Sequence, residues 1–305
     1  MISKINLLSL LVIILYACSP ASKPSNEKSE LLQMDSISIE RQSISDALTF
    51  WVSFDQGTEA DFGNGDRNIY NGDFNKYTKD SLPDVNLGLD STSISVVENA
   101  GKYGAALEFP LGTSQVAGYK LKGNMAFAES NWNGTLSFWM RLNSEEIPNR
   151  YCDPIQLTDK DYASDAIWVD ITKNDVPPDF RLGFFGDQPT WDPNNLKGKG
   201  EEFFFRLQKV SEPPFRKDTW THVVVTWEKI NAEEIGRAKL YINGLYMGPT
   251  GPIKEPFNWN MNKATMRLGT GKYVGFFDDI AVFDRTLAPE EIQYVYELPL
   301  GITEL

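Results

Sequence analysis

The sequence predicts an all-β protein, an antiparallel sandwich or barrel that ends in one short helix. From Ala47 onward, eleven or so short runs of apolar and β-branched residues are separated by Gly, Asn, Asp and Pro, which is the pattern of strands joined by turns. Asn243-Gly244 stands between two such runs and suits a two-residue type I′ hairpin turn. Helical periodicity is convincing in one segment, at the C-terminal end.

The predicted strands are taken in chain order. They are ALTFWVSF (47–54), AALEF (105–109), VAGYKL (116–121), TLSFWMRL (135–142), AIWVDIT (166–172), FRLGFFG (180–186), FFFRLQ (203–208), WTHVVVTWE (220–228), AKLYI (238–242), TMRLG (265–269) and GFFDDIAVF (275–283). Residues 245–248 complete the hairpin with 238–242. The helix is APEEIQYVYEL (288–298), because Pro289 comes early and Glu290 and Glu291 suit the positive end of the helix dipole. Two stretches, 55–93 and 187–202, are expected to be long loops.

The N-terminal residues have the pattern of an export signal. Lys4 precedes an apolar stretch that ends in LYAC, Leu15 to Cys18, which resembles a bacterial lipobox. Residues 1–17 are therefore predicted to be a lipoprotein signal peptide, with Cys18 lipidated; an ordinary secretory signal with an incidental cysteine is the alternative. Ser19 is not acidic, which favours the outer membrane if the source is Gram-negative. The polar residues 18–45 are predicted to be a tether, and 46–300 the folded domain.

The bulk properties exclude some partners. Lys and Arg number 29 against 42 Asp and Glu, a net charge of −13, so nucleic acid and acidic membrane surfaces are not expected to bind. Membrane contact is expected through the lipid alone. Because Cys18 is used by the lipid, Cys152 is left without a partner for an intramolecular disulfide.

Several motifs resemble one known family. Segments over about residues 47–298 resemble laminin-G-like domains. They are TFWVSFD with DFGNGDRN, GKYGAALEF, LSFWMRL, WTHVVVTWE with AKLYINGLYMG, and GFFDDIAVFDRTLAPEEIQYVY. The resemblance implies a two-sheet antiparallel jelly-roll sandwich with a short C-terminal helix, in the concanavalin A-like lectin/glucanase superfamily. That fold contains lectins, adhesion modules, glycanases and lyases, so it implies little about function.

Catalytic patterns are weak. His222, the only histidine, alternates with strand residues and is expected to be structural. The Glu-x-Asp-x-x-Glu strand of the superfamily's glycanases is absent; the nearest carboxylates, Asp170 with Asp175 and Glu201-Glu202, lack its spacing. The sequence therefore argues against an enzyme, although carboxylates from different strands could still converge.

Three tryptophans stand among Asn, Asp and Pro rather than in apolar runs: Trp132, Trp191 and Trp259. Such indoles can stack on a sugar while neighbouring polar groups bond its hydroxyls. The alternative, weighed equally, is that they fix loops to the edge of the sandwich.

Calcium is the candidate cofactor. Asp55, Asp61, Asn64 and Asp66 offer oxygen ligands within one Gly-bearing loop. The family resemblance implies a structural calcium between this segment and the last strand, at Asp55 and Asp278; turn stabilisation is the alternative.

The last strand carries two adjacent aspartates. Side chains alternate along a strand, so Asp278 and Asp279 are expected on opposite faces. Asp278 would share the core side with Phe276, Ile280 and Val282, and Asp279 would face out as an ordinary surface residue.

The leading hypothesis is a lipid-anchored, exported module that binds a glycan without catalysis. The alternatives are a structural or protein-binding envelope lipoprotein, or a divergent glycan hydrolase or lyase.

Overall fold

A computed structural model describes residues 38–74, 84–90, 93–142, 144–147, 151–172, 178–196 and 200–305. The chain divides into two units, 1–40 and 41–305, and the second contains both sheets. The predicted signal peptide, Cys18 and residues 18–37 of the predicted tether lie outside the described residues. Within the described part, no helix has the length and apolar character needed to span a membrane.

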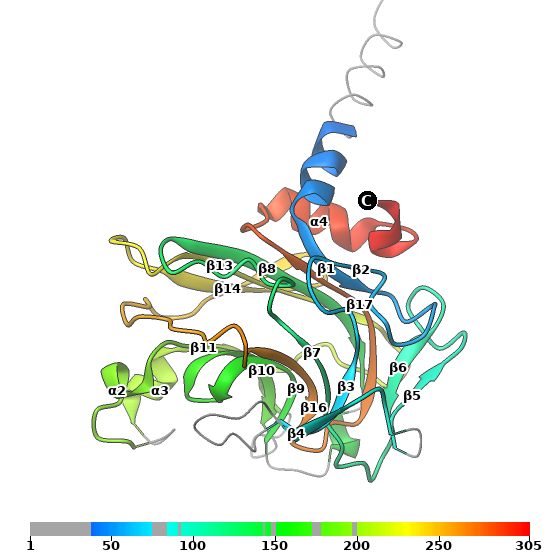
Figure 1. Ribbon diagram of the computed structural model, residues 1–305, viewed down its shortest axis with the longest axis horizontal. Helices are drawn as coiled ribbons and strands as arrows, with labels where there is room; N and C mark the ends of the chain where they lie inside the picture. Colours follow the sequence, from blue (N-terminus) through cyan, green and yellow to red (C-terminus); the bar gives the residue numbers. More distant parts are fainter. Residues whose placement is uncertain are drawn as a thin grey trace, which may run out of the picture. The chain divides into compact units, whose positions relative to one another are not determined.

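Two antiparallel sheets form the domain (Figure 1). The nine-stranded sheet contains β1 (Leu48–Val52), β2 (Phe62–Gly63), β5 (Ser95–Val97), β6 (Ala106–Phe109), β8 (Trp132–Arg141), β13 (Thr221–Ile230), β14 (Arg237–Ile242), β15 (Leu245–Pro249) and β17 (Gly275–Phe283). Its strands follow the order β15-β14-β13-β8-β17-β1-β2, and β6 pairs with both β17 and β5.

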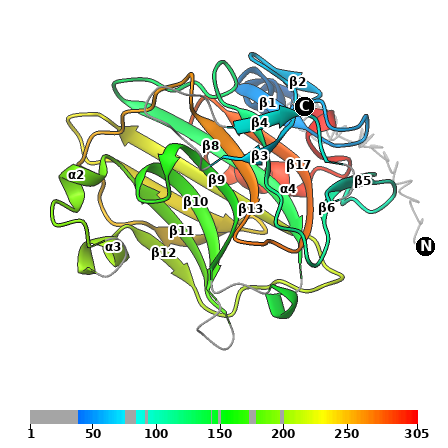
Figure 2. The same cartoon turned by 60° about the horizontal axis from the view of Figure 1, so that its bottom comes forward.

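The eight-stranded sheet contains β3 (Tyr70–Asp73), β4 (Asp84–Leu87), β7 (Ala117–Lys120), β9 (Tyr151–Asp161), β10 (Ser164–Thr172), β11 (Phe180–Phe185), β12 (Leu207–Val210) and β16 (Thr265–Thr270). Its order is β12-β11-β10-β9-β16-β7-β3-β4 (Figure 2). β16 joins β9 to β7 although the three strands are far apart in the chain, and the two antiparallel sheets confirm the predicted jelly-roll sandwich.

The core lies between the sheets. Alternate side chains of each strand point inward, such as Leu157 on β9, Val169 on β10 and Phe138 on β8, and all three are at most 1% exposed. Packing the two inward faces against each other removes their apolar surface from water, which is the main source of stability for such a fold.

The outer faces of the two sheets are covered differently. On the nine-stranded sheet, α4 (Pro289–Glu297) and η2 (Gly301–Glu304) pack through Ile292, Val295 and Ile302 onto Val224 and Phe283. Residues 41–46 are helical and add the buried Ile44 to the same cluster, so part of the predicted tether is folded.

The outer face of the eight-stranded sheet is covered at one end by α2 (Gln188–Trp191) and α3 (Glu201–Phe205). Trp191 and Phe203 pack there on Trp168 and Phe185.

Most predicted strands are confirmed within a few residues, and several other regions differ from the prediction. The run 203–208 was expected to be one strand, but 201–205 is helical and only Leu207–Val210 pairs with β11. Two glutamates in the first turn favour the helix. β9 is missing from the prediction because Pro154 and six polar residues break its pattern, and β5 is missing as well. The expected loop 55–93 contains β2, β3 and β4, and the expected loop 187–202 contains α2.

The hairpin turn is confirmed. Asn243 and Gly244 have φ values of 50° and 76°, as a type I′ turn requires, and Ile242 pairs with Leu245.

Candidate functional site

Polar side chains cover the outer face of the eight-stranded sheet between its two ends. Strand alternation turns them outward because their neighbours in the sequence, such as Leu157, Met266 and Leu182, point into the core. We call this set the polar face: Tyr70 on β3, Lys120 on β7, Arg267 on β16, Tyr151, Asp153 and Gln156 on β9, Asp170 on β10 and Arg181 on β11.

The register places these residues beside one another across the sheet. Gln156 is opposite Trp168 on one side and Arg267 on the other, and Arg267 is opposite Gly118, which in turn pairs with Tyr70. One transverse row therefore crosses five strands.

Hydrogen bonds hold the planar groups of the polar face in fixed positions. Arg181 Nε donates to Asp170 Oδ1 at 2.8 Å, and its Nη2 donates to Asp170 Oδ2, which completes a two-pronged ion pair. Arg267 Nη1 donates to Gln156 Oε1 at 3.0 Å. Both guanidinium groups are buried, at 8% and 0% exposed, so the face is rigid before any ligand arrives.

Two carboxylates from different strands converge on this face. A bulge in β9 lies between Cys152, which pairs with Ile171, and Ile155, which pairs with Val169, so Asp153 lies next to Asp170. Burial, the largest influence, and the nearby charge of Asp170 raise the pKa of Asp153, although Arg181 lowers it. The two carboxyls titrate together, and the protonated form of Asp153, which can donate a hydrogen bond, is favoured over that of a free aspartate.

Tyr151 is the exposed aromatic ring of the polar face. Its side chain is 46% exposed at the start of β9, and the Arg181 guanidinium lies 5.5 Å from the centre of its ring. An accessible ring beside fixed donors and acceptors is the usual arrangement for stacking on a sugar.

A small cavity of about 130 Å³ opens at the β3–β7–β16 end of the same face. Tyr70, Phe74, Val85, Lys120, Asn262 and Thr265 line it.

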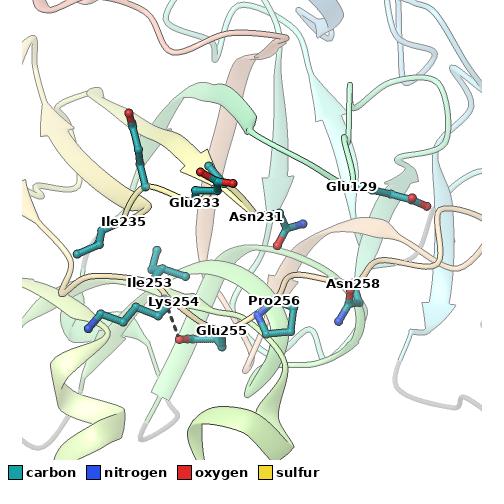
Figure 3. A pocket seen from close by; sticks show the side chains of 11 residues that line it. Glu129, Asn231, Glu233, Ile235, Ile253, Lys254, Glu255, Pro256 and Asn258 are labelled. Atoms are coloured by element: carbon teal, nitrogen blue, oxygen red, sulfur yellow. Dashed lines mark hydrogen bonds between the residues drawn. The ribbon is translucent and has the colours of Figure 1, made fainter.

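A larger cavity of about 640 Å³ lies at the end of the sandwich, between the loop joining β13 to β14 and residues 253–258 (Figure 3). Asn231 fixes its floor by accepting from Phe257 N at 2.7 Å and donating to Phe257 O at 2.8 Å. The carboxylate of Glu255 is buried in an ion pair with Arg206, at 2.7 Å. Its walls contain no aromatic ring among the described residues, so the polar face is the stronger candidate for a sugar.

Asp55 and Asp278 approach the same tight turn, residues 101–105. Asp55 Oδ1 accepts from Ala105 N at 2.7 Å, and Asp278 Oδ2 accepts from Tyr103 N at 3.0 Å. A Cβ at Gly101 would lie 2.7 Å from Asp278 Oδ2, and one at Gly104, where φ is +101°, would lie 2.3 Å from Asp55 Oδ1. Only glycine allows both carboxylates to approach this closely.

One oxygen in this region lacks a partner. Asp278 Oδ1 is buried and accepts no hydrogen bond among the described residues. Burial, the largest influence, together with the charges of Asp279 and Asp55, raises the pKa of Asp278 to about 8. An unpartnered buried carboxylate oxygen, close enough to Asp55 to feel its charge, fits a cation bound by both carboxylates.

The other predicted calcium ligands lie elsewhere or are already engaged. Asp61 Oδ2 accepts from Ser53 N at 2.7 Å. Asn64 donates through its backbone to Thr49 O at 3.1 Å, and its carbonyl lies near Gly123 instead of the 101–105 turn. In the described part of the chain no group of three or more Asp, Glu, His or Cys side chains is placed to hold a metal ion. Backbone or water oxygens would have to complete a calcium site.

The prediction for Asp279 is wrong. Asp279 is 4% exposed, its Oδ1 accepts from Trp51 Nε1 at 2.5 Å, and its Oδ2 accepts from Ile302 N at 2.9 Å. The cause is a bulge between Asp278 and Ala281, where Asp279 adopts a φ of 48°.

The bulge also shifts the alternation of core-facing and outward-facing side chains along β17. Phe277 packs in the core before it, and Ile280 and Val282 pack there after it. The prediction that Asp278 lies on the core side is therefore also wrong. Asp278 pairs with Trp139, which stacks on Tyr296 of α4, so the Asp278 side chain lies on the outer side of the sheet.

The three candidate tryptophans are core residues. Trp132, Trp191 and Trp259 are 1%, 6% and 7% exposed. Trp191 Nε1 donates to Ala163 O at 3.0 Å, and Trp259 Nε1 donates to Asp165 O at 2.6 Å. Their burial overturns the prediction that they stack on a ligand and supports the alternative that they fix loops, because no ring face is open to a sugar.

His222 is buried in the nine-stranded sheet beneath α4. Its Nε2 lies 2.8 Å from Ser137 Oγ, and its ring is 4.9 Å from that of Trp139. Burial and the charge of Lys102 lower its pKa from 6.5 to about 3, so it is neutral. At 1% exposed it reaches no substrate, and its structural role agrees with the prediction.

The residues of the polar face other than Asp170 were missed for a physical reason. Their proximity depends on which strands pair, and some of the pairs join positions more than a hundred residues apart, as with Arg267 and Gln156. The available signal was the alternation of polar and apolar residues in WVDIT and MRL.

Comparison with known proteins agrees with this architecture. The family model of the concanavalin A-like lectin/glucanases superfamily matches residues 113–293, more than half of the chain. No curated protein sequence gives a significant match.

Solved structures share the fold at low sequence identity. Domain 4 of AbnA, a GH43 extracellular arabinanase from Geobacillus stearothermophilus solved in complex with arabinotriose, is 15% identical with a TM-score of 0.50; the match covers 81% of this chain and 97% of that domain. The botulinum neurotoxin serotype D binding domain is 15% identical with a TM-score of 0.51, over 85% of this chain. The match covers about half of that toxin chain, 52%. By its family model and its fold, the chain belongs to the concanavalin A-like lectin/glucanase superfamily.

Proposed function

We propose that this protein is an exported, lipid-anchored module that binds a glycan through its polar face. One observation carries the proposal: planar hydrogen-bonding groups from adjacent strands are fixed in two neighbouring rows beside an accessible tyrosine. The buried pairs hold in place the accessible groups that can meet a sugar, namely the Tyr151 ring and the partly exposed side chains of Tyr70, Lys120 and Asp153, so little entropy is lost when the ligand binds.

The two outer faces differ in a way that supports this choice. The nine-stranded sheet is covered by α4 and η2 through apolar contacts, so its outer face is occupied. The arabinotriose bound to the AbnA domain also supports a glycan ligand, since that domain shares this fold over 97% of its length.

Affinity electrophoresis against a polysaccharide panel tests the proposal. Tyr151→Ala is expected to weaken retention by up to about tenfold, because an aromatic contact contributes about 0.5–1.5 kcal/mol. Tyr246→Ala is the matched control, since Tyr246 is 53% exposed on β15 of the other sheet. A folded protein that no polysaccharide retains would remove the glycan-binding proposal.

The lipid anchor rests on Leu15–Cys18 and Ser19. Metabolic labelling with a radioactive fatty acid should mark the wild-type chain and leave Cys18→Ser unlabelled. Fractionation of the source cells should place the labelled protein in the outer membrane. Label on the Ser variant would contradict the anchor.

A structural calcium is proposed at the 101–105 turn. Asp55 and Asp278 would hold it, and the ion would offset the burial and the neighbouring charges that raise the pKa of Asp278. Calcium should then raise the melting temperature of the wild type, and Asp278→Asn should abolish that increase. Equal melting temperatures with calcium and with chelator would refute the site.

Glycan cleavage is the second candidate, favoured by the pairing of Asp153 with Asp170. A protonated carboxyl beside an ionised one is the arrangement of acid catalysts in glycosidases. Release of reducing ends from a retained polysaccharide, lost in Asp153→Asn, would establish cleavage; retention without product supports binding alone.

A further inference from the structure

The small cavity at the β3–β7–β16 end of the polar face has a definite size and position. Its volume of about 130 Å³ is close to that of an engineered protein cavity of about 150 Å³ that accepts benzene. It therefore has room for one six-membered ring and not for a chain. β4, which supplies Val85, is the last strand at this edge of the sheet, so a ligand that crosses the polar face ends here.

The charged groups beside the cavity balance one another. Lys120 Nζ donates to Asp66 Oδ2 at 3.0 Å and to Tyr70 Oη at 2.8 Å. Although burial opposes ionisation of Asp66, hydrogen bonds from Tyr70, Asn68 and Lys120 lower its pKa well below the usual range. Burial lowers the pKa of Lys120, but Tyr70 and Asp66 outweigh it and raise that pKa. The ion pair persists at physiological pH, so neither Lys120 nor Asp66 is left to attract an ionic ligand. Lys122 is a further cation nearby, but it is exposed to solvent, which screens its charge, and it is bonded to Asn262 Oδ1.

Donor groups remain available at the cavity wall. An ammonium has three N–H donors, and Lys120 uses two of them on Asp66 and Tyr70. Asn262 Oδ1 accepts from Lys122 Nζ at 2.9 Å and its backbone N–H donates to Asn260 Oδ1 at 3.1 Å, which leaves the side-chain NH2 group of Asn262 as the donor for a ligand. These donors match the hydroxyl oxygens of a sugar.

Apolar surface forms the rest of the cavity. The rings of Tyr70 and Phe74 and the side chain of Val85 line it, and the Lys120 ammonium lies 4.1 Å from the centre of the Tyr70 ring. Aromatic and aliphatic walls suit the C–H faces of a sugar ring.

We propose that this cavity is the subsite for one uncharged terminal sugar ring of the glycan that binds the polar face. The inference rests on the proposed glycan-binding function and adds to it the charge and the position of the recognised unit. Lys120 and Asn262 donate to the hydroxyls of this ring, and the remaining units extend over β16 and β9.

Titration calorimetry with neutral trisaccharides and with trigalacturonate tests the subsite. The neutral probes are arabinotriose, xylotriose, cellotriose and maltotriose, and at least one of them is expected to bind the full chain. Asn262→Ala should weaken that binding about 3- to 10-fold, the effect of losing one hydrogen bond. Asn258→Ala is the control, because Asn258 is an exposed asparagine that lines the other cavity.

The outcomes separate this inference from the function on which it rests. If trigalacturonate alone binds, or if Asn262→Ala binds neutral probes as tightly as the wild type does, the subsite is refuted and glycan binding stands. If no probe and no polysaccharide binds the folded wild type, glycan binding itself is refuted.

Discussion

The neutral His222 makes the stability of this protein sensitive to pH in a calculable way. The side chain is buried between Ser137, Trp139 and Tyr296, and its Nδ1 has no partner among the described residues. Burial and Lys102 lower its pKa from 6.5 to about 3. Between these pH values the unfolded chain binds a proton that the folded chain does not, so stability decreases as pH falls through 6.5.

The magnitude follows from the two pKa values. At pH 7.5 the histidine is neutral in both states and contributes almost nothing. At pH 5.0, pKa values of 6.5 unfolded and about 3 folded correspond to a loss of about 2 kcal/mol of unfolding free energy. The raised pKa values of Asp278, about 8, and Asp279, about 6, act in the opposite direction, because the folded state then holds the extra protons.

Comparison with His222→Gln isolates the histidine. The glutamine amide can replace Nε2 beside Ser137 but does not titrate, and the carboxylate contributions are common to both proteins. Urea unfolding, followed by tryptophan fluorescence at pH 7.5, 6.5, 5.5 and 5.0, gives the free energy of each. The wild type should lose about 2 kcal/mol relative to His222→Gln between the extreme pH values. Parallel pH curves for the two proteins would refute the reasoning.

Three further predictions concern stability, each measured by chemical unfolding at pH 7.5. Arg181→Met should destabilise the domain by about 3–5 kcal/mol, because it leaves the buried Asp170 without its cation; an effect below 1 kcal/mol would show that this carboxylate is solvated. Trp132→Ala should cost about 3–5 kcal/mol, since this 1% exposed ring packs on Trp227, Phe257 and Trp259, whereas an exposed ligand-binding ring would cost little. Gly244→Ala should cost about 1 kcal/mol or more, because φ is +76° and the new Cβ would lie 2.2 Å from Gln293 Oε1; unchanged stability would contradict the type I′ assignment.

Local sequence patterns determined most of the secondary structure. The hairpin at Asn243-Gly244 and the helix after Ala288 depend on a few consecutive residues, and both are found where the sequence predicts them. The family resemblance supplied the two-sheet architecture, and the isolated His222 was correctly expected to be structural.

The tertiary structure decided which side chains lie in the core and which lie on the surface. The alternation rule that placed Asp279 on the surface fails at one bulge, and a bulge is fixed by pairing with β8 and β1 more than by local sequence. Because their neighbours in the sequence are polar, Trp132, Trp191 and Trp259 were expected to be exposed. In the folded chain, residues from distant segments pack on all three rings and bury them. The polar face depends likewise on pairing: Asp153 meets Asp170, and Arg267 meets Gln156, only after the sheet forms. Sequence fixes the propensity of each strand, while contacts between strands far apart in the chain set the surface that a ligand meets.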